Sequence, residues 1–258
     1  MAAPVRTTLT DEQVTELVGL IKGSDSVELK LTVPEEQQRS ALTALGVDPL
    51  NAQIRQVFFF ETPNLDLDAA GVVVRARRIQ GKGGDSIVKL RPVVPDTLPA
   101  ELRTSASFRV EVDALPGGYV CSATMKGTPA AEDVRSTAHG RRPIRKLFSK
   151  EQRAYYAAHA PEGIGLDDLI VLGPIFVLKG KLDLIDLPDR RIAVEMWMYP
   201  DGSRLLELST RVGTGEAFQA AAELRAHLIG LGIDLSGEQE TKTKKALAYF
   251  VGALHEGE

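Results

Sequence analysis

A carboxylate and an ammonium lie two residues apart in the otherwise mostly apolar segment 27–33. Because side chains alternate between the two faces of a strand, Glu28 and Lys30 point the same way. The pattern recurs in other strand-like segments. Charged residues share a face in the pairs Arg75 and Arg77, Lys89 and Arg91, and Glu207 and Arg211, and in two triplets, Arg109 with Glu111 and Asp113, and Lys179 with Lys181 and Asp183. Glu195 is alone in its segment. Guanidinium and ammonium groups suit phosphate oxygens, whereas carboxylates suit Mg²⁺ or Mn²⁺. The repeated pattern is typical of a site for a phosphate chain and a divalent cation.

The charged faces have two explanations. An antiparallel sheet with one face in water carries mixed charges routinely, and this is the ordinary explanation for any single strand. Here the opposite faces are strongly apolar and several helices are available to cover them, which favours a barrel that is apolar outside and charged within. We therefore predict an α+β fold with a closed or nearly closed antiparallel barrel of about eight strands and helices packed outside.

The elements that must position these residues follow from periodicity and turn signals. Thr10 with Gln13, and Ser149 with Gln152, have the spacing of capping boxes and predict helix starts. The predicted helices span 10–23, 149–159, 216–231 and 241–254, and the predicted strands span 27–33, 53–61, 71–78, 86–91, 107–115, 119–125, 175–185, 191–199 and 204–212. No clean linker interrupts the chain, so we expect one domain over residues 1–258, with helices at both ends.

Composition excludes several classes of function. The formal net charge is −4, which disfavours a general binder of nucleic acid or of anionic membranes. The single cysteine, Cys121, allows neither an intramolecular disulfide nor a thiolate cluster, and the four histidines lie far apart without an HExxH motif. The apolar run 169–178 is too short to span a bilayer, and residues 1–10 lack the pattern of a secretory leader. We expect a cytoplasmic protein whose oligomeric state is open, with a homodimer among the options.

The order of the charged motifs resembles that of a known family. Val27-Glu28-Leu29-Lys30, Phe60-Glu61-Thr62-Pro63, Val74-Arg75-Ala76-Arg77 and Ile87-Val88-Lys89-Leu90-Arg91-Pro92 run in the order found in CYTH-domain proteins, also called triphosphate tunnel metalloenzymes. The resemblance continues through Leu206-Glu207-Leu208-Ser209 to the basic start of the last predicted helix. This family includes class IV adenylate cyclases, thiamine triphosphatases and inorganic tripolyphosphatases.

The resemblance implies roles for individual residues. Glu28 and Lys30 match the catalytic signature strand, which reads Glu-x-Glu-x-Lys in the family. The implied phosphate-binding residues are Arg75, Arg77, Lys89, Arg91, Lys181 and Lys244. The implied ligands of Mg²⁺ or Mn²⁺ are Glu28, Glu111, Asp113, Glu195 and Glu207.

Two positions depart from the family pattern. Ser26 stands where the signature strand has its first Glu, and Ser209 replaces the second Glu of the late Glu-x-Glu pair. A serine hydroxyl is a weak, neutral substitute for a carboxylate, and lowering the pKa of a water requires a firmly held cation. The sequence therefore predicts an intact phosphate cradle more strongly than a working metal site.

Three functions follow from the resemblance. The first is a metal-dependent hydrolase of inorganic tripolyphosphate or an organic triphosphate, that is, a triphosphatase. The second is a non-catalytic protein that binds polyphosphate or a phosphorylated ligand. The third is a class IV adenylate cyclase, ranked lower because no segment marks an adenine pocket. The expected partner in each is a triphosphate or polyphosphate small molecule.

Overall fold

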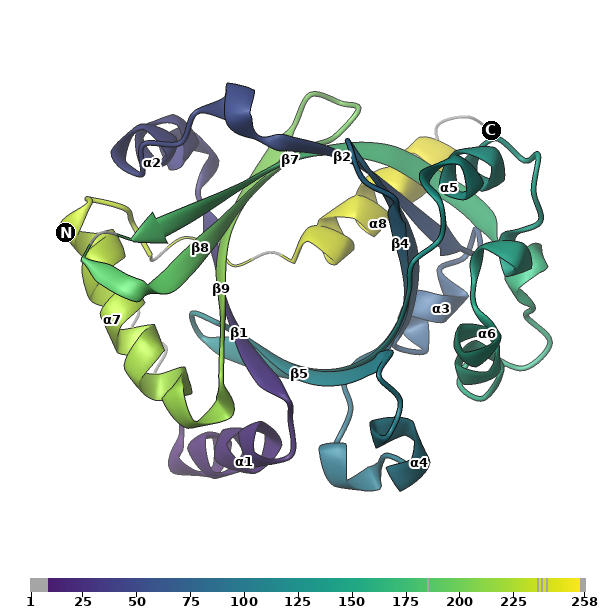
Figure 1. Cartoon of the computed structure of the whole chain (residues 1–258), viewed down its shortest axis with the longest axis horizontal. Coiled ribbons are helices and arrows are strands. Elements are labelled where there is room, and N and C mark those ends of the chain that lie inside the picture. Colours follow the sequence, from purple (N-terminus) through teal and green to yellow (C-terminus); the bar gives the residue numbers. More distant parts are fainter. Residues whose placement is uncertain (1–8, 185, 236, 238, 240, 256–258) are drawn as a thin grey trace.

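The computed structural model describes residues 9–255 except 185, 236, 238 and 240. The prediction that no secretory leader is present concerns residues 1–10, most of which lie outside the described residues. In the described part of the chain, nine strands form a closed barrel in the spatial order β1-β5-β6-β4-β3-β2-β7-β8-β9 (Figure 1). They are β1 (Ser26–Val33), β2 (Gln53–Glu61), β3 (Val72–Ile79), β4 (Gly84–Leu90), β5 (Phe108–Leu115), β6 (Gly118–Gly127), β7 (Ile170–Leu184), β8 (Leu187–Met198) and β9 (Arg204–Val212).

The closure of the barrel corrects the predicted topology. The sequence predicts an antiparallel barrel of about eight strands, but β1 pairs in parallel with β5, with Glu28 opposite Asp113. On its other side β1 pairs antiparallel with β9, and the remaining neighbours are also antiparallel. Strands that alternate in direction can close a ring only when their number is even. A ring of nine must therefore contain a parallel pair, and the pairing of β1 with β5 supplies it.

Helices surround the barrel and also close one of its ends. The helices are α1 (Asp11–Lys22), α2 (Gln38–Ala44), α3 (Asp66–Ala69), α4 (Ala100–Arg103), α5 (Ala131–Ala138), α6 (Lys150–Ala157), α7 (Ala217–Gly230) and α8 (Lys242–His255). Both predicted capping boxes are present, at Thr10 before α1 and at Ser149 before α6. Seen down the barrel, α8 lies across the opening while the other helices lie outside the ring (Figure 1).

The outward faces of the strands bury apolar side chains under helices. One cluster joins Val27, Val74 and Val110 to α1 and α6. A second joins Leu31 and Leu208 to α2 and α7. This burial is the main favourable term for the fold, because apolar surface leaves water while the charged faces are turned inward.

A third apolar cluster closes one end of the barrel. Val57 and Phe59 share the lumen-facing parity of Arg55 on β2, and they pack with Trp197 of β8. Ala246 and Leu247 of α8 join the same cluster and are 0% and 3% exposed. The apolar contacts of α8 therefore fix its first turn over the charged part of the lumen.

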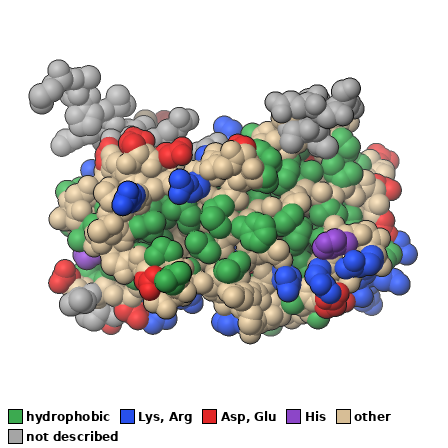
Figure 2. All heavy atoms as spheres, turned by 90° about the horizontal axis from the view of Figure 1, so that it is seen from above, with side chains coloured by type: hydrophobic (Ala, Val, Ile, Leu, Met, Phe, Trp, Pro, Cys, Tyr) green, Lys and Arg blue, Asp and Glu red, His purple; other side chains and the backbone are tan. Residues whose placement is uncertain are grey.

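One face of the barrel carries exposed apolar side chains. Figure 2 shows apolar groups gathered on the side that lies uppermost in Figure 1, over β2 and β7. Ile54 of β2 and Phe176 of β7 are 40% and 42% exposed. Among the described residues, none of the helices has the length and hydropathy that a membrane crossing would need.

Candidate functional site

The barrel encloses a polar cavity of about 300 Å³. Among the described residues, ten Lys and Arg side chains line it: Lys30, Arg55, Arg75, Arg77, Lys89, Arg91, Lys126, Lys179, Arg211 and Lys242. Six carboxylates of the described part of the chain line it as well: Glu28, Asp85, Glu111, Asp113, Glu195 and Glu207. The described lining thus has an excess of four positive charges, although the whole chain has a net charge of −4. Such a local excess of positive charge attracts an anion.

Ten of the twelve site residues named from the sequence line this cavity. They are Glu28, Lys30, Arg75, Arg77, Lys89, Arg91, Glu111, Asp113, Glu195 and Glu207. Sequence reasoning did not assign site roles to Arg55, Asp85, Lys126, Lys179, Arg211 or Lys242, which also line it. The alternation of side chains in strands already placed Lys179 and Arg211 on charged faces in the sequence, although no role was assigned to either of them.

Lys181 lies away from the cavity. It is exposed and is opposite Ala193 in the pairing of β7 with β8. These two strands have 15 and 12 residues, and the end of β7 reaches out from the ring beside α2 (Figure 1). Two residues further on, Asp183 pairs with Arg191 on this exposed extension. The lumen position on β7 belongs to Lys179.

Lys244 also lies away from the cavity, and Lys242 takes the place we predicted for it. Lys244 is exposed on α8, whereas Lys242 lines the lumen. Residues two apart on an α-helix point in nearly opposite directions, so only one of the two can face inward. The apolar contacts of Ala246 and Leu247 decide which one does.

The strands β7, β8, β9, β1 and β5 form a continuous part of the lumen in which every carboxylate contacts a cation. We call it the paired wall; it consists of Glu28, Lys30, Glu111, Asp113, Lys179, Glu195, Glu207 and Arg211, together with Lys242 of α8. Within it, Lys242 Nζ lies 2.8 Å from Glu195 Oε2 and 2.6 Å from Glu207 Oε1. Lys179 Nζ lies 2.5 Å from Glu195 Oε1. The Trp197 Nε1–H donates to Glu195 Oε2 at 3.2 Å.

The other half of the paired wall is built in the same way. Lys30 Nζ lies 3.1 Å from Glu28 Oε2 and 2.9 Å from Asp113 Oδ1. Arg211 lies 2.9 Å from Glu111 Oε1. Burial alone would lower the pKa of Lys30, but Asp113 and Glu28 outweigh it and raise that pKa. At neutral pH Lys30 is therefore a fixed cation rather than a proton acceptor.

Asp113 and Glu195 of the paired wall stay ionised despite burial. Burial alone would raise the pKa of Asp113, but Lys89 and Lys30 outweigh it and hold that pKa at about 2. Burial would also raise the pKa of Glu195, and Lys242 and Lys179 bring it well below its ordinary value instead. Opposite charges a few ångströms away in a poorly solvated site favour the ionised form of a carboxylate in this way.

The strands β2, β3, β4 and β6 form the remaining, continuous part of the lumen, in which positive charge is in excess. We call it the cationic wall; it consists of Arg55, Arg75, Lys89, Arg91 and Lys126. Arg77 and Asp85 lie between these residues and neutralise each other, at 2.6 Å between Arg77 Nη2 and Asp85 Oδ2. Within the described residues, Arg55, Arg75, Arg91 and Lys126 have no carboxylate within ion-pair distance, and Lys89 has only Asp113 at 3.7 Å.

Arg75 is the most costly member of the cationic wall. Its Nε is buried and has no hydrogen-bond partner among the described residues. Burial, and then the neighbouring Arg77, lower the pKa of Arg75 to about 10, so it is charged at neutral pH. Burial also lowers the pKa of Lys89, and Asp113 only partly offsets that effect. Buried donors and charges without partners cost free energy, which an anion in the lumen would recover.

The carboxylates of the lumen do not fit a divalent cation. Mg²⁺ and Mn²⁺ require several free oxygen ligands around one point. Each of the five predicted ligands instead contacts a Lys or Arg of the chain, and no group of three or more His, Cys, Asp or Glu in the described residues has the arrangement of a metal site. Ser209, where the family has a carboxylate, is 7% exposed.

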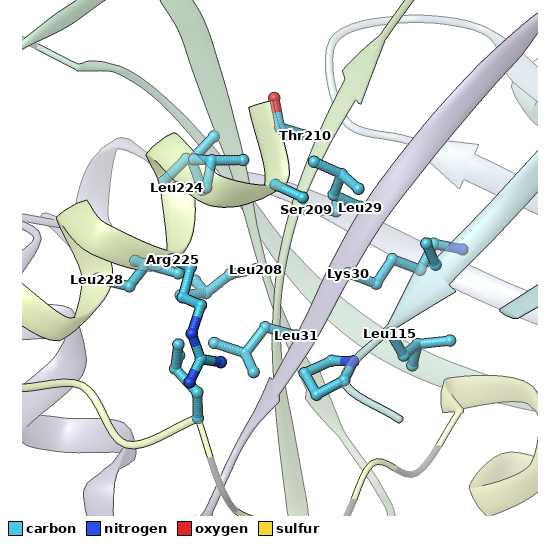
Figure 3. Close-up of a pocket in the computed structure, with 15 residues that line it drawn as sticks. Leu29, Lys30, Leu31, Leu115, Leu208, Ser209, Thr210, Leu224, Arg225 and Leu228 are labelled. Atoms are coloured by element: carbon cyan, nitrogen blue, oxygen red, sulfur yellow. The ribbon is translucent and has the colours of Figure 1, made fainter. Parts of the chain in front are cut away.

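An apolar pocket of about 240 Å³ lies outside the charged lumen (Figure 3). Leu29 and Leu31 of β1, Leu208 of β9, and Leu224 and Leu228 of α7 contribute to its lining. Lys30 passes its stem along this pocket and directs its nitrogen away from the leucines (Figure 3). Among the described residues that line this pocket, Arg225 and Lys30 are the charged ones, and Lys30 contributes its apolar stem, so the pocket does not suit a phosphate chain.

The fold of the barrel has counterparts in known structures. A Hippeastrum protein, described as an adenylyl cyclase candidate with dominant triphosphatase activity, superposes with a TM-score of 0.64 and 13% identity over 86% of this chain and 94% of its own. A candidate adenylate cyclase from Bacillus halodurans gives a TM-score of 0.60 and 13% identity over 86% of this chain and 97% of its own. The chain has a CYTH-type fold. No protein-family model and no curated protein matches the sequence.

Proposed function

We propose that the protein binds a triphosphate or a longer polyphosphate in the lumen of its barrel. The observation that carries this proposal is the cationic wall, in which the buried Nε of Arg75 has no partner among the described residues. Guanidinium forks on neighbouring strands can contact successive phosphate groups, because adjacent strands lie about 4.8 Å apart. A chain of phosphates laid across β2, β3, β4 and β6 would compensate the positive charge that the protein leaves unpaired.

The paired wall favours binding without metal-dependent hydrolysis. The carboxylates that would hold a metal are already compensated by Lys30, Lys179, Lys242 and Arg211. Opposing effects act on Glu28: burial raises its pKa, Lys30 and Lys242 lower it, and the net result is a lowered pKa. A carboxylate of lowered pKa is a weak general base, since efficient proton transfer needs a pKa near the working pH.

Triphosphate hydrolysis is the second candidate. The Hippeastrum protein of similar fold is described as having a dominant triphosphatase activity, and this observation favours the same chemistry here. In such a reaction Lys30 would orient the terminal phosphate, and Arg75 and Lys89 would absorb the charge that develops in the transition state. The adenylate cyclase alternative, the single-domain organisation and the cytoplasmic location stay predictions.

The test is binding measured by calorimetry and thermal unfolding in the presence of EDTA. Phosphate, pyrophosphate and tripolyphosphate are compared, and affinity should rise with chain length because more groups of the cationic wall are engaged. Samples with tripolyphosphate, ATP or thiamine triphosphate, with and without Mg²⁺, are then analysed for phosphate, pyrophosphate and cyclic AMP. Binding without any of these products supports the first candidate, and phosphate release supports the second. A protein that none of the three phosphates binds or stabilises would refute the proposal.

A further inference from the structure

Two carboxylates of the paired wall face each other directly. Glu195 of β8 and Glu207 of β9 are partners in the strand register, and they are 3% and 3% exposed. Like charges directly opposite each other on neighbouring strands destabilise a sheet, and burial increases the cost. The pair therefore needs a cation between its two carboxylates.

Lys242 supplies that cation from a different element. Its Nζ contacts one oxygen of each carboxylate, at 2.8 Å and 2.6 Å. Burial alone would lower the pKa of Lys242, but Glu195 and Glu207 outweigh it and raise that pKa. The ammonium also lies 5.5 Å from the centre of the Trp197 ring, whose N–H donates to Glu195. A bridging cation at this point would have to displace the ammonium.

The position of Lys242 is built into the fold. It is the first residue of α8, where the helix dipole disfavours a positive charge, so the side chain is not placed there by local preference. The buried Ala246 and Leu247 anchor the helix to the apolar cluster that closes the barrel. The ammonium is therefore held between the carboxylates by packing one turn further along the helix.

We propose that Lys242 is a built-in counterion that replaces the divalent cation at the Glu195–Glu207 pair and keeps metal ions from binding there. The direct consequence concerns metal binding by the protein alone. A second consequence rests on the proposed function: a phosphate chain would bind in the lumen with the same affinity whether or not a metal ion is present.

The first experiment titrates Mn²⁺ into the protein without phosphate and follows bound metal by electron paramagnetic resonance. Lys242→Met keeps an unbranched side chain that is one atom shorter and removes its charge, so the two carboxylates become free to hold a cation. Its affinity for Mn²⁺ should exceed that of the wild type by about 10- to 100-fold, the range over which neighbours of a metal site change its affinity. Lys242→Met/Glu207→Gln should lose this gain.

Lys242→Arg is the matched control, because it keeps the positive charge and should gain no Mn²⁺ affinity. Thermal unfolding gives a second readout: Mn²⁺ should raise the melting temperature of Lys242→Met and leave the wild type unchanged, since a ligand stabilises only the state that binds it. Wild-type protein that binds Mn²⁺ and loses it in Glu207→Gln would overturn the proposal, even if Lys242→Met fails to fold. A folded Lys242→Met without increased Mn²⁺ affinity would also overturn it.

The second experiment compares tripolyphosphate binding in EDTA and in Mn²⁺. Equal affinity within a factor of about two, or 0.4 kcal/mol, supports the proposal, whereas binding that requires Mn²⁺ contradicts it. If tripolyphosphate does not bind under either condition, the proposed function fails. The Mn²⁺ titration without phosphate still decides the role of Lys242 in that case.

Discussion

The two walls of the lumen are both rich in charge, but they neutralise it in different ways. The paired wall has four cations and five carboxylates, and each carboxylate contacts at least one of the cations. The cationic wall has five cations, and its nearest carboxylate contact is the 3.7 Å approach of Lys89 to Asp113. The carboxylates of the paired wall are compensated by cations of the protein, whereas most of the positive charge of the cationic wall has no carboxylate partner among the described residues.

Because of this difference, the two walls should contribute to different properties of the protein: one to the stability of the folded state and the other to ligand affinity. Charges compensated within the protein contribute to the folded state before any ligand arrives, and breaking one partner of such a pair is expensive. Charges without compensation raise the energy of the free protein, and that energy is recovered when an anion binds. Substitutions in the paired wall should therefore act mainly on folding, and those in the cationic wall mainly on affinity.

The largest effect is expected from Glu195→Gln. This change leaves Lys179 and Lys242 without the carboxylate that both contact, and it should lower the free energy of unfolding by about 3–5 kcal/mol. Urea denaturation measures the change. Asp183→Asn is the control, because its ion pair with Arg191 is largely exposed and should matter by less than about 1 kcal/mol. Equal effects of the two substitutions would mean that the paired wall is not a buried network.

Arg75→Met should have the opposite combination of effects. If the proposed function is correct, loss of this buried cation should weaken tripolyphosphate binding by about 2–5 kcal/mol, which is 30-fold or more. The free protein should be as stable as the wild type or more stable, because an uncompensated buried charge is replaced by an apolar side chain. Calorimetry and urea denaturation measure the two effects. Arg109→Met removes an exposed arginine and serves as the control. An Arg75→Met protein that is less stable than the wild type but binds tripolyphosphate with full affinity would contradict the assignment of Arg75 to binding.

Local patterns predicted most of both walls. Alternation within a strand is a property of the backbone, so the shared faces of Glu28 with Lys30 and of Arg75 with Arg77 could be read without knowing the fold. The capping boxes at Thr10 and Ser149 were predictable for the same reason, since each involves residues only three apart.

Long-range packing determined the features that the sequence did not predict. Lys242 faces the lumen because residues of α8 further along the chain pack against strands more than 40 residues away, and no local pattern distinguishes it from Lys244. The parallel pairing of β1 with β5 depends on how the ring closes. Lys181 lies outside because β7 is longer than the wall of the barrel, although its parity is that of Lys179.

A smaller effect on stability is expected at acid pH, and it concerns Asp113, the residue of the paired wall that contacts Lys89 of the cationic wall. Lys89 and Lys30 hold the pKa of Asp113 at about 2, below its ordinary value of 3.8. A carboxyl whose pKa is lower in the folded state stabilises the protein above the ordinary pKa, and this stability is lost as the pH falls from 3.8 towards 2. The contribution is at most about 2 kcal/mol. Urea denaturation between pH 6 and about 3 should show a shallower acid loss for Asp113→Asn than for the wild type; parallel curves would contradict this.

The smallest effect is a dependence of tripolyphosphate affinity on alkaline pH, and we attribute it to Lys89 of the cationic wall. Burial lowers the pKa of Lys89, so the free protein loses this proton below the ordinary value of 10.5. A bound anion favours the protonated lysine, and the complex therefore binds more protons than the free protein. Affinity should fall as the pH rises towards 10.5, by no more than about tenfold per unit for one proton.

Lys89→Arg tests the assignment of this pH dependence, because a guanidinium stays charged over the same range. Calorimetry at several pH values should give a flatter profile for the variant than for the wild type. The wild type and Lys89→Arg should have nearly the same free energy of unfolding, since the only carboxylate near Lys89 among the described residues is Asp113 at 3.7 Å. Identical profiles would show that a different group carries the dependence. A variant that loses stability rather than pH dependence would place Lys89 in the paired wall.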